Sequence, residues 1–233
     1  MKQGFTAFKM KVGKNIEDDK RRAKIIRETI GKNGIIMTDA NQIWNVSTAI
    51  KWMKELKEYN IYWIEEPTSP DDIIGHLIIS KELNPLGILV ATGEHCSNQV
   101  LFRQFLELNA LQIVQPDTCR LCSIPEIIMV LLLSKIYHKP VCMHAGGVGL
   151  NEMARHFAMI DYILISKNKK DRFWEYAQHL KQHFQEETDH INAKYFPPLQ
   201  SGYVRIKLSS IQQYQFPNGN FWKQRLKQNN SKL

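Results

Sequence analysis

The sequence predicts an α/β fold, an incomplete TIM-type (β/α) barrel of about seven parallel strands with helices outside them. Short apolar runs alternate with helical patterns from the N-terminus to about residue 185, which is the rhythm of strand–helix units. Asp39, Glu65 and Glu94, which follow three of these runs, are spaced by 26 and 29 residues, about one such unit. The 233 residues are slightly fewer than the ~250 of a complete eight-unit barrel.

Seven segments have the apolar character of strands. The first alternates between polar and apolar residues, and the others are short apolar runs. They cover residues 5–11, 35–38, 61–64, 88–91, 111–115, 140–143 and 162–165. Because the carboxyl ends of barrel strands meet on one face, we expect the polar residues that follow these runs to lie together.

Helices are expected between the strands. Asn15 is a suitable N-cap for the first helix, and Gly31 is a suitable stop signal at its end. Ser47 is expected to cap the second helix. Further helical patterns cover residues 73–83, 99–108, 125–137 and 151–159.

The pattern indicates one barrel domain followed by a tail. Residues 1–185 carry the strand–helix rhythm and are assigned to the barrel. Residues 186–233 are rich in Gln, Asn, Pro and aromatic residues without a clear period. We expect them to form an irregular C-terminal tail packed on the barrel.

Composition excludes two classes of partner. The net charge is +8, but residues 1–32 carry ten basic against four acidic residues and residues 205–233 carry six against none, so the middle of the chain is acidic. A basic groove for nucleic acid is therefore not expected. No apolar stretch approaches the ~18 residues of a membrane span. With no signal-peptide pattern, the four cysteines indicate reduced thiols in an intracellular protein.

Three carboxylates indicate a metal centre. Asp39, Glu65 and Glu94 each follow an apolar run, so the barrel brings them to one face, where they would repel each other without a cation. Hard carboxylate ligands favour Mg²⁺, with Mn²⁺ as the alternative, over zinc. A divalent ion there can bind a substrate carboxylate and stabilise the charge that develops when the neighbouring carbon loses a proton.

Acid–base groups are expected on the same face. Lys9 and Lys11 are two residues apart on one predicted strand, so their side chains share a face. Asp117 and His144 follow adjacent predicted strands, 27 residues apart, where the Asp can hydrogen-bond the His and set its tautomer. Lys11 and His144 would then serve opposite faces of the reacting carbon.

These residues resemble the enolase superfamily, mandelate racemase subgroup, in which a Lys or His base works with Mg²⁺. The matching motifs are Lys9-Met10-Lys11, Asp39-Ala40-Asn41, Trp63-Ile64-Glu65-Glu66-Pro67, Gly93-Glu94 and the Asp117/His144 pair. Longer strings resemble L-fuconate dehydratases within that subgroup. They are residues 65–76, 144–150, 175–180 and 214–222.

The resemblance implies a role for each residue. Asp39, Glu65 and Glu94 are implied as Mg²⁺ ligands. Lys11 is implied as the base that removes the proton next to the carboxylate, and Lys9 as the group that neutralises that carboxylate. His144, oriented by Asp117, is implied as the acid that protonates the departing 3-hydroxyl. Glu175 and Asn41 are implied substrate contacts.

The implied reaction is loss of water from L-fuconate, through an enediolate, to 2-keto-3-deoxy-L-fuconate. Relatives of this kind begin with a capping domain and a first barrel strand, and neither is seen before the Lys9 strand. Two alternatives therefore stay open, a catalytically inactive fragment or isoform and a dehydratase or epimerase for another acid sugar. The two exposed strand edges of an open barrel invite self-association. The expected location is the cytoplasm or the mitochondrion.

Overall fold

The computed structural model describes residues 2–177, 180–185, 190–197, 199, 201–202 and 205–230. A five-stranded parallel sheet in the order β1-β2-β3-β4-β5 forms its centre. These strands are β1 (Ala7–Lys11), β2 (Ile35–Asp39), β3 (Ile61–Glu65), β4 (Leu89–Thr92) and β5 (Ile113–Val114). The order follows the chain, as expected for successive strand–helix units in a barrel.

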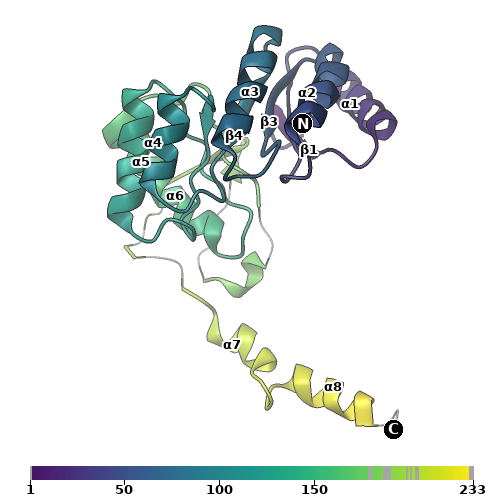
Figure 1. Cartoon of the computed structure of the whole chain (residues 1–233). Coiled ribbons are helices and arrows are strands. Elements are labelled where there is room, and N and C mark those ends of the chain that lie inside the picture. The colour runs from purple at the N-terminus through teal and green to yellow at the C-terminus, as the bar shows by residue number, and fades with distance from the viewer. Residues whose placement is uncertain are drawn as a thin grey trace.

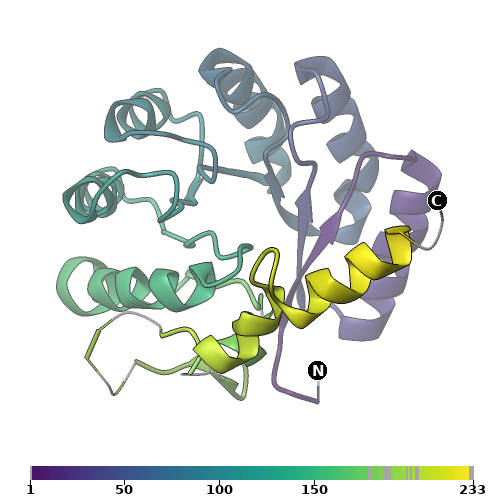
Figure 2. The same cartoon turned by 90° about the horizontal axis from the view of Figure 1, so that it is seen from below.

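Helices surround the outer face of the sheet (Figures 1 and 2). Most begin at a side chain that accepts a backbone N–H, including Asn15 before α1, Asp72 before α3 and Asn98 before α4. The second helix is capped by Asn45, which accepts the N–H of Thr48, and not by Ser47 as predicted. The six helices are α1 (Ile16–Ile30), α2 (Val46–Leu56), α3 (Ile73–Leu83), α4 (Gln99–Glu107), α5 (Ile124–Ile136) and α6 (Leu150–Ile160).

Shorter 3₁₀ turns, η1 (Lys57–Tyr59) and η2 (Asn84–Leu86), follow α2 and α3. Both end at a residue with left-handed backbone, Asn60 and Gly87, from which the chain enters the next strand. None of the helices in the described part of the chain combines the length and apolar character needed to cross a bilayer.

The strand predicted at 162–165 is wrong. Residues Asp161–Ser166 form η3, a π-helical turn that continues directly from α6. Ile163 and Leu164 are 57% and 69% exposed, so this apolar run does not enter the barrel. A run of four apolar residues fits a buried strand and a helix face equally well, and here the preceding helix decides.

The described residues form five parallel barrel strands and not the seven predicted. Residues 140–143 contribute only an isolated parallel bridge, Val114 with Val141, beside β5. The next segment around the barrel is 171–173. It lies beside residues 140–143, since Cys142 Sγ donates to the Asp171 carbonyl and accepts the Phe173 N–H. The result is an open barrel, a five-stranded sheet extended on one side by two segments without ladder pairing.

The core lies on both faces of the sheet. On the outer face, side chains such as Ile36, Ile64 and Val90 pack with the helices. On the inner face, a separate cluster contains no helix residue and is contributed by successive strands and the segments beside them. Its members are Met37, Trp63, Ala91, Ile113 and Cys142, with Phe173 packed against them. This inner layer supports the carboxyl ends of the strands from below.

The open side of the barrel lies beside β1. Within the described residues β1 pairs only with β2. Phe5, just before β1, contacts the rings of Tyr176 and His190 with centroid distances of 5.1 and 5.0 Å. His190 belongs to the small hairpin of β6 (His190–Ile191) and β7 (Lys194–Tyr195). Side chains therefore connect the two ends of the open barrel without strand pairing.

The predicted tail divides into two parts. The first part is the β6–β7 hairpin, which follows η4 (Lys181–His183) at the end of the predicted barrel domain, and the second part is a last segment of α7 (Leu208–Ile211), η5 (Gln212–Tyr214) and α8 (Asn220–Asn230). That last segment extends away from the barrel instead of packing on it (Figure 1). Its aromatic residues pack on each other, Phe216 on Trp222 and Tyr214 on Phe221, although Phe216 remains 68% exposed. Residues 178, 179, 186–189, 198, 200, 203–204 and 231–233, parts of the predicted tail and of the 175–180 string, lie outside the described residues.

Candidate active site

The strand ends bring the predicted residues to one edge of the sheet. The pairing of β1 with β2 and of β2 with β3 places Lys11 opposite Asp39 and Asp39 opposite Glu65. Both carboxylates are buried, at 1% and 0% exposure. Because burying unpaired carboxylates is costly, counter-charges must lie close to them.

Lys9 supplies the first counter-charge. Its Nζ lies 2.6 Å from Glu65 Oε1, 2.5 Å from Glu175 Oε1 and 3.5 Å from Asp39 Oδ2. Burial lowers the pKa of Lys9, but Glu65, Glu175 and Asp39 outweigh it and the net shift is upward. Burial raises the pKa of Glu65, with Lys9 opposing it. The ammonium of Lys9 therefore ties three carboxylates together.

Lys11 supplies the second counter-charge from the open side of the site. Its Nζ lies 2.5 Å from Asp39 Oδ2, while its side chain is 65% exposed. The backbone N–H of Asn41 donates to the other oxygen of Asp39 at 2.9 Å. Asp39 is thus fixed on both oxygens. The side chain of Lys11 reaches solvent and is accessible to a ligand.

His144 and Asp117 form the predicted dyad. His144 Nδ1 lies 2.5 Å from Asp117 Oδ2, and Asp117 Oδ1 accepts the backbone N–H groups of Cys119 and Arg120. Burial lowers the pKa of His144, but Asp117, Glu94 and Glu175 outweigh it and the pKa is raised. Burial raises the pKa of Asp117, but the hydrogen bond from His144 and those backbone donors outweigh it and hold the pKa below its usual range. The dyad is therefore built to carry a protonated imidazole.

Glu175 joins the dyad to the lysines, although no strand pattern precedes it. One carboxylate oxygen contacts Lys9, and the other accepts the N–H of Ala145 at 2.8 Å and lies 3.9 Å from His144 Nε2. Burial raises the pKa of Glu175, but Lys9 outweighs this and the net shift is downward. Glu175 therefore stays ionised between the two halves of the site.

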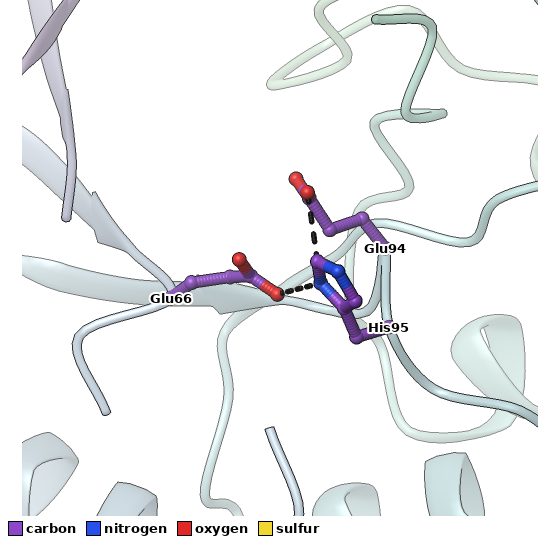
Figure 3. A group of neighbouring side chains, drawn as sticks. All are labelled: Glu66, Glu94 and His95. Carbon is purple, nitrogen blue, oxygen red and sulfur yellow. Dashed lines mark hydrogen bonds and ion pairs between the residues drawn. The ribbon is translucent and has the colours of Figure 1, made fainter. Parts of the chain in front are cut away.

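Glu94 faces a different set of neighbours from those predicted. Its Oε2 lies 3.5 Å from His144 Nε2, and its Oε1 lies 3.6 Å from His95 Nδ1. Burial raises the pKa of Glu94, with His144 opposing it. Among the described residues, the group whose ligand atoms all lie within 4.8 Å of one another is Glu66, Glu94 and His95 (Figure 3). Of the three predicted metal ligands, only Glu94 belongs to it.

Sequence reasoning did not single out Glu66 and His95. Glu66 is fully buried, and its carboxylate contacts His95 Nδ1 at 2.6 Å and the Gln42 amide at 3.0 and 3.1 Å. Glu66 and Gln42 have positive φ values of 41° and 69°, which are uncommon for residues with a side chain. The available signal was position, since Glu66 and His95 each follow a predicted ligand by one residue.

Asn41, a predicted substrate contact, also has positive φ, 43°. It is exposed at the edge of the site and acts on Asp39 through its backbone N–H. Non-glycine residues with left-handed backbone concentrate at functional sites, because surrounding structure must hold them there. The loop after β2 therefore has the character of a site-forming loop.

Lysine, histidine and carboxylate side chains thus gather at the strand ends of an open α/β barrel. Residues 1–204 match the family model described as "Enolase C-terminal domain-like", and the chain belongs to that family. It is 51% identical to mitochondrial enolase superfamily member 1 of Xenopus laevis over 96% of this chain and 50% of the relative. It is 45% identical to L-galactonate dehydratase of Hypocrea jecorina over 92% of this chain and 48% of the relative.

Solved structures agree with this assignment. The crystal structure of human mitochondrial enolase superfamily member 1 has a TM-score of 0.92 and 49% identity, covering 97% of this chain and 51% of that one. A racemase from Streptomyces coelicolor A3(2) with bound magnesium has a TM-score of 0.75 and 26% identity, covering 90% of this chain and 55% of that one. The chain spans about half the length of the curated relatives it matches.

Proposed function

We propose that this chain carries the catalytic part of a Mg²⁺-dependent sugar-acid dehydratase whose substrate is L-fuconate. The observation that carries the proposal is the pairing of an accessible lysine, Lys11, with a dyad of His144 and Asp117 around buried carboxylates. A base and an acid on one strand-end face can remove a proton and a hydroxyl from neighbouring carbons of one substrate.

The donor set fits a hard divalent cation. Asp39, Glu65 and Glu94 offer carboxylate oxygens alone, which suit Mg²⁺, with Mn²⁺ as the alternative. Lysine ammonium groups lie 2.6 Å from the buried Glu65 and 2.5 Å from the buried Asp39, so positive charge already lies beside both carboxylates. The bound magnesium of the Streptomyces relative supports this choice. When bound, the cation would stabilise negative charge on the substrate carboxylate.

The chain's own residues supply the proton transfers. Lys11 takes the proton from the carbon next to the carboxylate. Lys9 is placed to balance the charge of that carboxylate. Protonated His144 gives its Nε2 proton to the 3-hydroxyl, which leaves as water, and the enol product rearranges to the 2-keto-3-deoxy acid. The raised pKa of His144 favours the protonated starting state that this step needs.

The substrate assignment rests on sequence. The strings at 65–76 and 144–150 support L-fuconate, and the identity with a L-galactonate dehydratase supports a six-carbon aldonic acid. The purified chain is incubated with Mg²⁺ and a panel of L-fuconate, L-galactonate and galactarate, and keto-acid product is measured. Product from L-fuconate ahead of the others supports the proposal. Preference for another acid would support the proposed dehydration reaction but reject L-fuconate as the substrate.

A second candidate is a chain without catalytic activity that acts through protein binding. The observation that favours it is the open edge of β1, which pairs only with β2 among the described residues. In that case no keto acid forms from any acid in the panel, with or without Mg²⁺. A chain that forms no product but exchanges the substrate α proton with D₂O would still carry a working base. That result would show that proton abstraction persists and that only the loss of the hydroxyl fails.

A further inference from the structure

A cavity of about 230 Å³ lies at the opposite end of the barrel from the candidate active site. It is lined by the end of α5 with the turn after it and by the segment after η3. Two cavity residues, Pro140 and Arg172, come just before Val141 and Phe173 in the segments beside β5. The active-site residues His144 and Glu175 come after Val141 and Phe173 in the same segments, at their other end. The charged and titratable residues that line the cavity are Lys135, His138, Lys139, Lys170, Asp171 and Arg172.

The two acidic groups near this cavity are already engaged. Asp161 is paired with Arg172 at 2.6 Å. Asp171 takes part in a hydrogen bond with the Tyr62 hydroxyl, an interaction that, with burial, raises the pKa of Tyr62. In the described part of the chain, Lys135, Lys139 and Lys170 have no carboxylate within ion-pair distance. Lys139 donates instead to a neutral amide oxygen, Asn109 Oδ1, at 2.6 Å. Three lysines that line the cavity therefore have no partner acid among the described residues.

The C-terminal end of α5 does not use these lysines as caps for its carbonyl groups. Helix C-termini attract cations because the last carbonyls are free. Here three of those carbonyls are capped by backbone N–H groups, Tyr137 to Leu133, His138 to Lys135 and Lys139 to Ser134, at 2.9, 3.2 and 2.8 Å. The helix end therefore does not need the lysine ammonium groups as caps. Lys139 is half-buried, and burial lowers its pKa with no acidic neighbour to oppose it.

We propose that this cavity, the basal cavity, binds a small oxyanion of the phosphate class, free or as a phosphomonoester. Lysines act as point charges that hold phosphate oxygens without demanding one geometry. The volume lies below the ~300 Å³ at which pockets for larger ligands begin, which suits a phosphate group. The bound anion would supply the counter-charge that Lys135, Lys139 and Lys170 lack. This site is independent of the proposed dehydratase activity.

The test is isothermal titration calorimetry of the full chain with inorganic phosphate and with glycerol 3-phosphate, at constant ionic strength. Lys139→Met and Lys170→Met each keep the aliphatic stem and remove the charge. Lys51→Met removes one charge from the outer surface of α2 as a matched control, and Lys11→Met removes one from the candidate active site. Circular dichroism verifies that each variant is folded. If Lys139→Met does not fold, Lys170→Met, which changes an exposed residue, provides the test.

We expect one saturable site, at least tenfold weaker in Lys139→Met and Lys170→Met and unchanged in Lys51→Met and Lys11→Met. Tighter binding of glycerol 3-phosphate than of phosphate would identify the phosphomonoester as the ligand, and the reverse would identify the free anion. Absence of saturable binding overturns the proposal. So does loss of binding in Lys11→Met with retention in Lys170→Met, because the anion would then occupy the candidate active site.

Discussion

Lys9 Nζ lies 2.5 Å from Glu175 Oε1, a contact between residues 166 positions apart that joins the first strand to the last segment of the open barrel. The same ammonium contacts Glu65 at 2.6 Å. One lysine thus links the metal-ligand candidates to the acid–base dyad across the gap beside β1. The stability and the chemistry of the site both depend on this link.

Replacement of Lys9 is expected to destabilise the fold. In Lys9→Met the buried Glu65 loses its counter-charge, and removing one member of a buried ion pair costs about 3–5 kcal/mol. Lys20→Met removes a lysine from a more exposed pair with Glu55 and is expected to cost much less. Urea denaturation of both variants compares the two. Equal losses would mean that the Lys9 network contributes no more than a surface pair.

Removal of the base is expected to abolish proton abstraction. Lys11→Ala should lower the rate of α-proton exchange with deuterated solvent by about 10²–10⁴-fold, the usual contribution of a general base. Because the Lys11 side chain is mostly exposed, the fold should persist. Lys14→Ala, which removes an exposed lysine three residues away, is the control. Exchange at the original rate in Lys11→Ala would refute the base assignment.

The dyad should make stability depend on pH. The folded pKa of His144 lies above the usual ~6.5, so its stabilising contribution is complete below that value and is lost as pH rises through the folded pKa. Asp117→Asn removes the main stabilising partner of the imidazolium, so the His144 pKa should fall. An NMR titration of the His144 ring protons measures this pKa directly. The difference in free energy of unfolding between the original chain and Asp117→Asn should narrow as the pH rises through the folded pKa of His144. A difference that does not change with pH would contradict the assignment.

Metal binding should separate the predicted ligands from the cluster seen around His95. Mg²⁺ should raise the melting temperature of the chain, and Asp39→Asn should abolish the shift. His95→Ala removes the imidazole of the Glu66, Glu94 and His95 group and should leave the Mg²⁺ shift in place, because Mg²⁺ prefers oxygen ligands. Loss of the shift in His95→Ala alone would move the cation site to that cluster.

The cap of α2 offers a local test of the fold. Asn45 accepts the Thr48 N–H at 2.9 Å, so Asn45→Ala should cost about 1 kcal/mol of unfolding free energy. Ser47 lies inside the helix and donates only to Asn45, and Ser47→Ala should cost much less. Thermal denaturation of both variants gives the comparison. A larger loss in Ser47→Ala would restore the cap position expected from sequence.

Local patterns were sufficient for much of this molecule. The helices at 16–30, 73–83 and 99–107 follow from caps and apolar periodicity, which are properties of neighbouring residues. The proximity of Asp117 and His144 follows from their spacing of one strand–helix unit, and the structure places them 2.5 Å apart. Parallel strands align their ends, so position in sequence translates into position on one face.

Other features depended on the assembled barrel. The run at 162–165 is locally ambiguous, and its continuation from α6 made it helical and exposed. No local pattern marks Glu175, which reaches Lys9 only because the last segment curls back toward β1. The contacts among Gln42, Glu66 and His95 come from loops after three different strands.

The sequence by itself determined the fold class, the order of the strands and the proximity of Lys9 and Lys11 to Asp39 and of Asp117 to His144. These depend on periodicity and spacing, which the chain carries locally. Only the tertiary structure decided how far the sheet closes, which groups neutralise the buried Asp39 and Glu65, and that Glu94 turns toward His95 and His144. The physical reason is that the ionic partner of a buried charge is chosen by three-dimensional proximity, and residues far apart in sequence supply it.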